Sequence, residues 1–171
     1  AAEFDSEINF TYCTEFVVGR DPEVQKDPLE LRLFLETIGD CVVDQYGYLV
    51  GVVTEAGANW CTVTTILDTD SQLGALVFRT GEVTVAMGDL ALMGQGKLKL
   101  SYLEGESSLI NGDMIVTSGL GGYYPPDLSI GTVEEVQLSD SGAAAYAVLA
   151  PSADFDSLVE VFVIKSFDVQ T

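Results

Sequence analysis

Residues 112–126 read Gly-Asp-Met-Ile-Val-Thr-Ser-Gly-Leu-Gly-Gly-Tyr-Tyr-Pro-Pro, a short apolar strand that enters a glycine-dense loop closed by two prolines. Glycine gives the backbone access to positive φ, and the paired prolines fix the direction in which the chain leaves the loop. The stretch therefore predicts one defined backbone path rather than a reaction centre. Within it, we expect Gly112, Asp113 and Gly119 to hold the backbone.

Short strand patterns recur on both sides of this segment. Leu29–Glu36 begins with the apolar–polar alternation of a half-buried strand, with a short helix as the alternative. The β-rich stretch Phe10–Gly19 leads to a turn at Arg20–Pro22, and one brief helical signal covers Pro151–Leu158. Many short strands at this spacing predict an all-β sandwich or barrel. The other expected strands are Tyr48–Glu55 and Trp60–Leu67 (joined by a turn at Ala56–Asn59), Leu76–Arg79, Glu82–Val85, Lys97–Leu103, Met114–Ser118, Ile130–Gln137, Ala144–Leu149 and Glu160–Ser166.

A weak internal repeat indicates how these strands are grouped. Gly39–Val43 resembles Gly112–Val116, and Gly51–Glu55 resembles Gly131–Glu135. A Gly-Asp pair before a strand is a turn device, because glycine takes the unusual backbone angle and aspartate bonds back to the chain. The repeat predicts two related β units that divide near residues 71–74.

The composition excludes several classes of function. The 171 residues include 27 acidic and seven basic side chains, a formal charge of −20, which repels phosphate backbones and anionic lipids. Nucleic-acid binding is therefore not expected, and the charge serves either solubility, including in a salt-adapted source, or the steering of a basic partner. A content of 47% hydrophobic residues indicates a folded chain. No apolar run approaches the roughly 20 residues that span a bilayer, so we expect a soluble fragment.

The chain has no histidine, which excludes Ser-His-Asp and Cys-His catalytic units and zinc sites with imidazole ligands. Cys13, Cys41 and Cys61 are odd in number and form no CxxC pair. Each lies beside apolar residues, so we expect them to be buried as small hydrophobic side chains.

Several short motifs resemble functional sites without meeting their requirements. Gly94–Lys97 lacks phosphate-loop spacing and precedes a strand, and Gly119–Gly122 has Tyr124 where a dinucleotide loop needs its last glycine. Asp68–Gln72 has two carboxylates at calcium-loop spacing but lacks the required Gly and Glu, so a turn is expected, with calcium as the alternative.

Catalytic residues are likewise not predicted. Ser118 has no GxSxG elbow and no histidine base, although a Ser-Lys dyad is formally open. The acidic pairs Asp154/Asp156 and Glu134/Glu135 are read as solvated, because a glycosidase needs two carboxylates about 5–10 Å apart across a cleft. We predict no catalytic residue, no cofactor and no metal.

The loop itself is the candidate partner-contact site. Leu120–Pro126 is expected to shape the surface, and Tyr123 and Tyr124 either contact a partner or close the end of a barrel. The site comprises Gly112, Asp113, Thr117, Ser118, Gly119, Leu120, Gly121, Gly122, Tyr123, Tyr124, Pro125 and Pro126.

Six ordered motifs resemble the extracytoplasmic domain of the rod-shape-determining MreC family. The most specific is Gly112–Pro126 followed by Ile130–Val133. Residues Pro22–Glu36 match poorly, and Asp127 stands where glycine is frequent in the family. The remaining motifs are Phe16–Pro22, Tyr46–Val53, Arg79–Glu82, Lys97–Leu103 and Pro151–Phe155 with Leu158, Val161 and Val163.

The resemblance implies a fold and a domain division. The family's fold is two six-stranded antiparallel β-barrels, similar in architecture to chymotrypsin-like proteases but without their triad. On this basis the first barrel covers residues 10–73 and the second 74–171, and the last strand is allowed to return to the first barrel.

The resemblance also implies a function and a location. MreC-like proteins are non-enzymatic scaffolds that link the MreB cytoskeleton, through MreD and RodZ, to peptidoglycan synthases, notably a class B penicillin-binding protein. We expect the chain to lie at the outer face of the cytoplasmic membrane, anchored by an N-terminal helix absent from this sequence, and to self-associate in the full-length protein as a dimer or larger assembly. The alternatives are a degenerate hydrolase and a glycan-binding β module acting on the cell wall.

Overall fold

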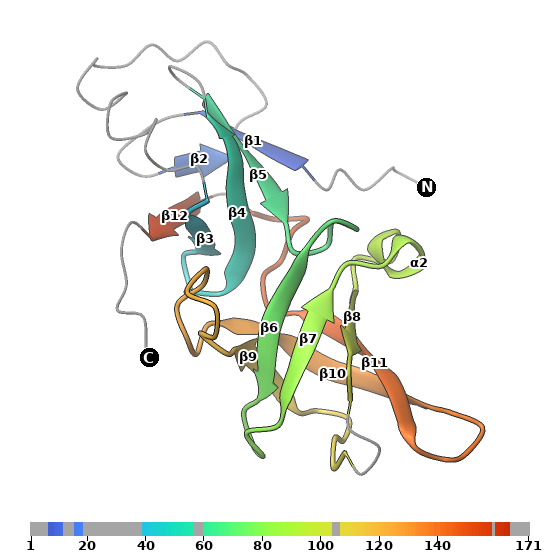
Figure 1. The fold of residues 1–171 in the computed structure, drawn as a ribbon. Coiled ribbons are helices and arrows are strands. Elements are labelled where there is room, and N and C mark those ends of the chain that lie inside the picture. The colour runs from blue at the N-terminus through green and yellow to red at the C-terminus, as the bar shows by residue number, and fades with distance from the viewer. Residues whose placement is uncertain are drawn as a thin grey trace.

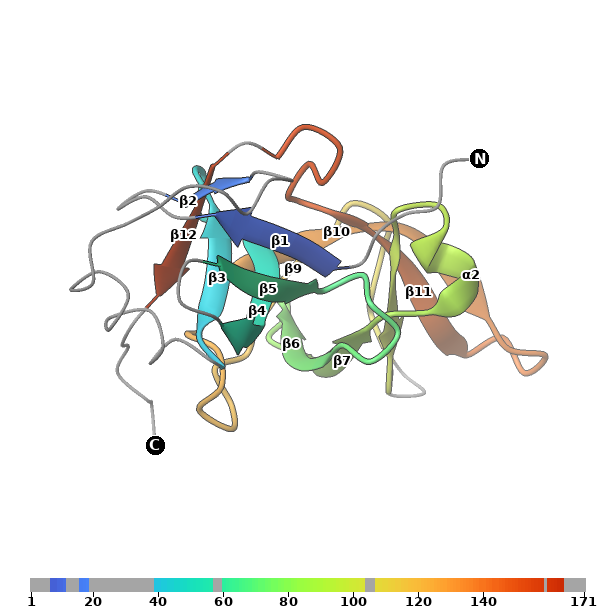
Figure 2. The ribbon, with the colours of Figure 1, turned by 90° about the horizontal axis from the view of Figure 1, so that it is seen from above.

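The computed structural model describes residues 7–11, 16–18, 39–56, 60–103, 107–158 and 160–164, which form two six-stranded sheets lying side by side (Figures 1 and 2). The all-β class is confirmed. No helix in this part of the chain is both long and apolar enough to cross a membrane.

The first sheet contains both ends of the described chain. Its strands are hydrogen-bonded in the order β1–β2–β12–β3–β4–β5, and β5 also pairs with β1. The last strand of the chain thus lies in the sheet built by the first strands. The bounds are β1 Glu7–Thr11, β2 Phe16–Val18, β3 Cys41–Asp44, β4 Leu49–Ala56, β5 Trp60–Thr65 and β12 Glu160–Ile164.

The second sheet is a closed six-stranded antiparallel barrel in the order β10–β11–β8–β7–β6–β9. Along β6 and β8 every second side chain is buried, as expected for strands with one face toward the barrel interior. The bounds are β6 Gln72–Val77, β7 Val83–Met87, β8 Leu98–Ser101, β9 Met114–Thr117, β10 Ser129–Leu138 and β11 Ala144–Pro151.

The sequence repeat is matched by a repeat of hydrogen bonds. Gly39 and Gly112 both have φ of +91°. Gly39 N–H donates to Val53 O at 2.7 Å, and Gly112 N–H donates to Val133 O at 2.8 Å. In both sheets the strand register then shifts just after the acceptor valine, between Val53 and Glu55 in β4 and between Val133 and Glu135 in β10. A Gly-Asp turn therefore precedes the corresponding strand pair in each sheet: β3 and β4 in the first, and β9 and β10 in the second.

The largest apolar core joins the two sheets. Cys41, Val43 and Leu49 of the first sheet belong to the same buried cluster as Leu98, Ile115 and other residues of the barrel. A second cluster, which includes Val50, Val63 and Val161, fills the first sheet itself. Alternate side chains of β3 and β4 thus contribute to two cores, which explains why the first three residues of β3 are all buried. The fourth, Asp44, accepts hydrogen bonds from Tyr46 N and Tyr48 N.

Two local predictions are corrected, and one short helix was not predicted. Pro151–Leu158 contains no helix beyond the end of β11, because the Asp154 carboxylate accepts hydrogen bonds from Asp156 N and Ser157 Oγ and supports a turn. Phe10–Gly19 is not one strand, since Thr11 pairs with Val17 across an antiparallel ladder. The four-residue helix α2 (Leu90–Met93), capped by the Asp89 carboxylate, was not predicted.

Other predictions fall on residues that are not described. The strand expected at 29–36, the turn at 20–22, most of the turn at 56–59 and Cys13 lie outside the described residues, as does the side chain of Cys61. Cys41 is fully buried and forms no disulfide, as expected.

Candidate functional site

The 118–127 loop, which connects β9 to β10, is tied at its base by Thr117. The buried Thr117 hydroxyl donates to Pro125 O at 2.6 Å and accepts from Leu128 N at 2.9 Å. Thr117 O also accepts from Asp127 N at 3.0 Å. The Thr117 side chain thus satisfies two backbone groups of the loop just before β10, where a buried unpaired group would be costly.

Asp113, immediately before β9, is held by Arg79 from the turn after β6. Arg79 Nε and Nη2 donate to the two carboxylate oxygens at 2.7 and 2.8 Å, a bidentate pair. Ile110 N donates to Asp113 Oδ2 at 3.0 Å, and Arg79 Nη2 also donates to Ser108 O at 2.8 Å. The hydrogen bonds from Arg79 lower the pKa of Asp113, so the carboxylate stays charged although it is buried.

Three glycines of the loop adopt the positive φ that the sequence predicted for this segment. Gly119, Gly121 and Gly122 have φ of +69°, +88° and +74°. A Cβ at Gly119 would lie 2.8 Å from Pro126 Cβ, so the residue also permits the close approach of the two sides of the loop. Asp127 also has a positive φ, +64°, a left-handed conformation that glycine adopts without strain.

The two tyrosines of the loop take opposite roles. Tyr123 is 77% exposed and Leu120 is 65% exposed, so both present apolar surface to solvent. Tyr124 instead packs against the large core, and burial raises its pKa to about 12. The loop runs beside β3 of the first sheet in both ribbon views (Figures 1 and 2). The sequence left open whether the two tyrosines contact a partner or close the end of a barrel. Tyr124 packs against the core, and Tyr123 is exposed, so contact with a partner stays a prediction for Tyr123.

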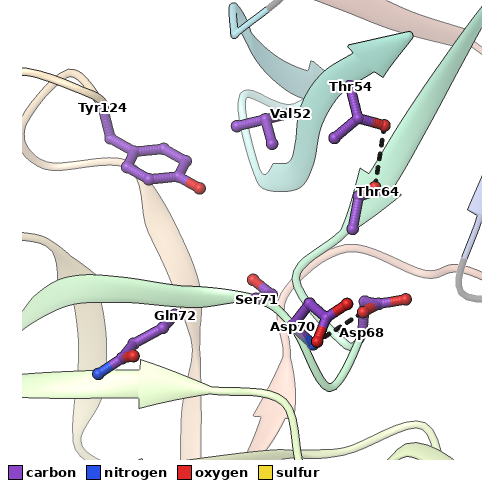
Figure 3. A pocket seen from close by; sticks show the side chains of 8 residues that line it. All are labelled: Val52, Thr54, Thr64, Asp68, Asp70, Ser71, Gln72 and Tyr124. Atoms are coloured by element: carbon purple, nitrogen blue, oxygen red, sulfur yellow. Dashed lines mark hydrogen bonds between the residues drawn. The ribbon is translucent and has the colours of Figure 1, made fainter.

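A cavity of about 310 Å³ opens between the two sheets next to this loop (Figure 3). Val52 of β4 and Thr64 of β5 form one wall, and Tyr124 faces them from the loop with its hydroxyl directed into the space. The connection between β5 and β6 contributes the base. The remaining lining residues are Thr54, Asp68, Asp70, Ser71 and Gln72.

The other motifs considered in the sequence take structural roles. The Asp68 carboxylate accepts from Asp70 N at 2.8 Å and supports a turn. Lys97 pairs with Glu134, and Ser118 Oγ accepts from Leu120 N at 3.2 Å. Among the described residues, no group of three or more Cys, Asp or Glu side chains is arranged to hold a metal ion.

Two features of the site were not found from the sequence. The pairing of Arg79 with Asp113 was missed, although both residues belong to motifs singled out there, because they are separated by 34 residues and meet only when the barrel closes. The cavity was missed because its walls come from four separate segments; its only sequence signal was the pair of carboxylates in Asp68–Gln72.

Comparisons with known proteins agree with the resemblance seen in the sequence. Residues 37–165 match the family model described as "Rod shape-determining protein MreC, barrel core". The cell shape-determining protein MreC of Listeria monocytogenes is 32% identical over 169 residues, covering 94% of this chain and 56% of the relative. The chain spans about half the length of the curated relatives it matches.

Solved structures share the fold. A crystal structure of MreC from Pseudomonas aeruginosa superposes with a TM-score of 0.73 at 24% identity, covering 94% of this chain and 99% of that one. A chain in a complex between penicillin-binding protein PBP2 and MreC from Helicobacter pylori superposes with a TM-score of 0.59 at 13% identity, covering 91% and 94%. With three quarters of its residues matched by the family model, the chain belongs to the MreC family of rod shape-determining proteins.

Proposed function

We propose that this chain is a non-enzymatic scaffold that helps to determine cell shape by organising peptidoglycan synthesis. The observation that carries the proposal is the family match over residues 37–165. The chemistry of the described residues is compatible with it, because the buried polar side chains Thr117 and Asp113 spend their hydrogen bonds on the backbone and on Arg79. The Cys41 thiol is no nucleophile either, since burial raises its pKa to about 12.

The proposed partner is a class B penicillin-binding protein. A member of this family from Helicobacter pylori forms a complex with PBP2, and that chain has the same fold. We further propose that the full-length protein connects to MreB through MreD and RodZ, and that it self-associates as a dimer or larger assembly. It would act at the outer face of the cytoplasmic membrane, to which an N-terminal helix would anchor it.

The proposed contact site is the loop at residues 118–127 with its supporting turn at 112–113. Leu120 and Tyr123 supply exposed apolar surface, while Thr117, Asp113 and Gly119 hold the backbone that presents them. Because the loop is tied at both ends, little conformational freedom remains to be lost when a partner binds, which favours affinity.

We also propose the finer architecture implied by the family. The pairing of β5 back to β1 supports a first barrel, so that the whole would have the arrangement of two barrels found in chymotrypsin-like proteases. The first unit would comprise β1 to β5, completed by β12. The second would begin with β6, whose first residue is Gln72, two residues before the boundary expected from the sequence.

The contact site is tested with an immobilised class B penicillin-binding protein ectodomain from the same organism. Leu120→Ser should weaken binding by at least about tenfold, the loss expected for an apolar anchor. Leu138→Ser is the matched control, because Leu138 is 64% exposed against 65% for Leu120 but lies at the end of β10. Equal affinity for the two variants would exclude the loop as the contact, and no binding by the unmodified chain would count against the partner itself.

A further inference from the structure

The cavity between the two sheets has two kinds of wall. One part is acidic and hydroxyl-bearing: Asp68 and Asp70 lie together in the connection between β5 and β6, close to Ser71 (Figure 3). The other part is apolar, made by the Val52 side chain and the ring of Tyr124, which lie across the space from the carboxylates. A ligand that fits both parts must carry a polar group at one end and a hydrocarbon segment behind it.

The charge of the lining fixes the sign of that polar group. None of the eight lining residues is basic, while Asp68 and Asp70 are both acidic. The hydrogen bond from Asp70 N to Asp68 Oδ1 fixes the turn that carries the two side chains. The hydroxyls of Thr54 and Thr64, 3.0 Å apart, and of Ser71 add further acceptors. An ammonium group, which has three donors and no acceptor, complements this set.

The size of the cavity distinguishes an organic cation from a metal ion. The volume of about 310 Å³ accommodates several non-hydrogen atoms in addition to a charged head. A bare divalent cation would need six or more oxygen ligands close together, and no group of three carboxylates or thiols gathers among the described residues. A chain of methylene groups, by contrast, would cover Val52 and the face of Tyr124, which also attracts cations.

We propose that this cavity binds a primary alkylammonium group of lysine length, with Asp70 as its charged partner and Val52 and Tyr124 against its hydrocarbon stem. The same chemistry is supplied by a free diamine or by a lysine side chain in a peptide. The site shares Tyr124 with the proposed contact loop but involves neither of its exposed apolar residues, Leu120 and Tyr123.

The test is a titration of the isotope-labelled chain, followed by backbone amide NMR, with N-acetyl-lysine amide and with N-acetyl-norleucine amide. The second probe keeps the hydrocarbon stem and lacks the charge. We expect saturable shifts at residues 52–54, 64 and 70–72 with the lysine probe alone. Comparison with cadaverine separates the sources: tighter binding of the lysine probe indicates a peptide, and tighter binding of cadaverine indicates a free diamine. Equal binding shows that the alkylammonium group alone is recognised, as proposed.

Asp70→Asn is the decisive variant. Asp70 is exposed, so the change removes charge without disturbing a core, and we expect the dissociation constant to rise about tenfold, as for the loss of a hydrogen bond to a charged group. Asp140→Asn is the matched control, since Asp140 is an exposed turn residue between β10 and β11. Equal shifts with both probes, or equal weakening by both substitutions, would overturn the proposal, because non-specific attraction to the acidic chain would then explain the binding.

Discussion

Asp113 and Thr117 show how individual side chains convert a flexible glycine-rich segment into a defined surface. Thr117 satisfies two backbone groups of the returning chain, Pro125 O and Leu128 N. Asp113 joins the loop before β9 to the turn that carries Arg79. Glycine at position 119 supplies the conformation that these bonds require.

The Asp113–Arg79 pair leads to a prediction about pH. Because the folded-state pKa of Asp113 lies below its unfolded value of about 3.9, the carboxylate stabilises the fold above that pH. This stabilisation should be lost as the pH falls through the lower, folded-state pKa. Asp113→Asn should therefore cost about 1–3 kcal/mol at neutral pH, the penalty for impaired buried hydrogen bonds.

Urea unfolding at a series of pH values measures this effect. The difference between the unmodified chain and Asp113→Asn should shrink in acid. Asp140→Asn, at an exposed turn, should change the free energy of unfolding by less than about 0.5 kcal/mol. A difference that stays constant from neutral pH into acid would show that the charge of Asp113 is not what stabilises the fold.

At the scale of the elements, the two sheets repeat one device. A Gly-Asp turn precedes β3 and β9, and a second glycine in the partner strand allows close backbone approach. A Cβ at Gly51 would lie 2.1 Å from Thr64 O, and one at Gly131 would lie 2.4 Å from Ala150 O. At these two glycines, β4 approaches β5 and β10 approaches β11 too closely for a side chain to fit.

Gly131→Ala should consequently separate β10 from β11. The new methyl group meets backbone atoms, which cannot rotate away. We therefore expect the free energy of unfolding to fall by about 1–3 kcal/mol. Gly94→Ala is the control, because Gly94 has φ of −62° and its nearest contact would be at 3.9 Å. Thermal unfolding of both variants measures the difference; similar melting temperatures would contradict the close approach.

At the scale of the molecule, a shared apolar core binds two sheets that carry a large excess of negative charge. Like charges at this density repel one another and oppose the compact state. The formal charge of −20 over 171 residues is balanced by few basic groups, of which Arg79 and Lys97 are paired.

Salt should therefore stabilise the folded chain. Screening shortens the range of repulsion to about 3 Å at 1 M ionic strength. We expect the melting temperature to rise between 10 mM and 1 M salt, equally in sodium chloride and potassium chloride, because screening does not depend on the cation. A melting temperature that is independent of salt would show that the charges lie too far apart to interact.

Much of the fold followed from local patterns. The alternation in β8 and the Gly-Asp repeats predict a strand and turns, because side-chain period and allowed φ are properties of a few neighbouring residues. The strand expected at Leu76–Arg79 was misplaced, since β6 is Gln72–Val77 and Arg79 lies in the following turn. The helix predicted at residues 151–158 is wrong, and the cause is also local. The Asp154 side chain forms hydrogen bonds that stabilise a turn, and this turn competes with a single turn of helix.

The amino-acid order by itself determined the β class, the absence of any histidine-based site and the positive φ of the glycines at 119, 121 and 122. Only the tertiary structure decided that Tyr123 faces solvent while Tyr124 lies against the core, that Arg79 meets Asp113, and that a cavity opens between the sheets. The physical reason is distance along the chain: strand period and turn geometry act over a few residues, whereas burial and pairing depend on segments that meet only when the sheets pack together.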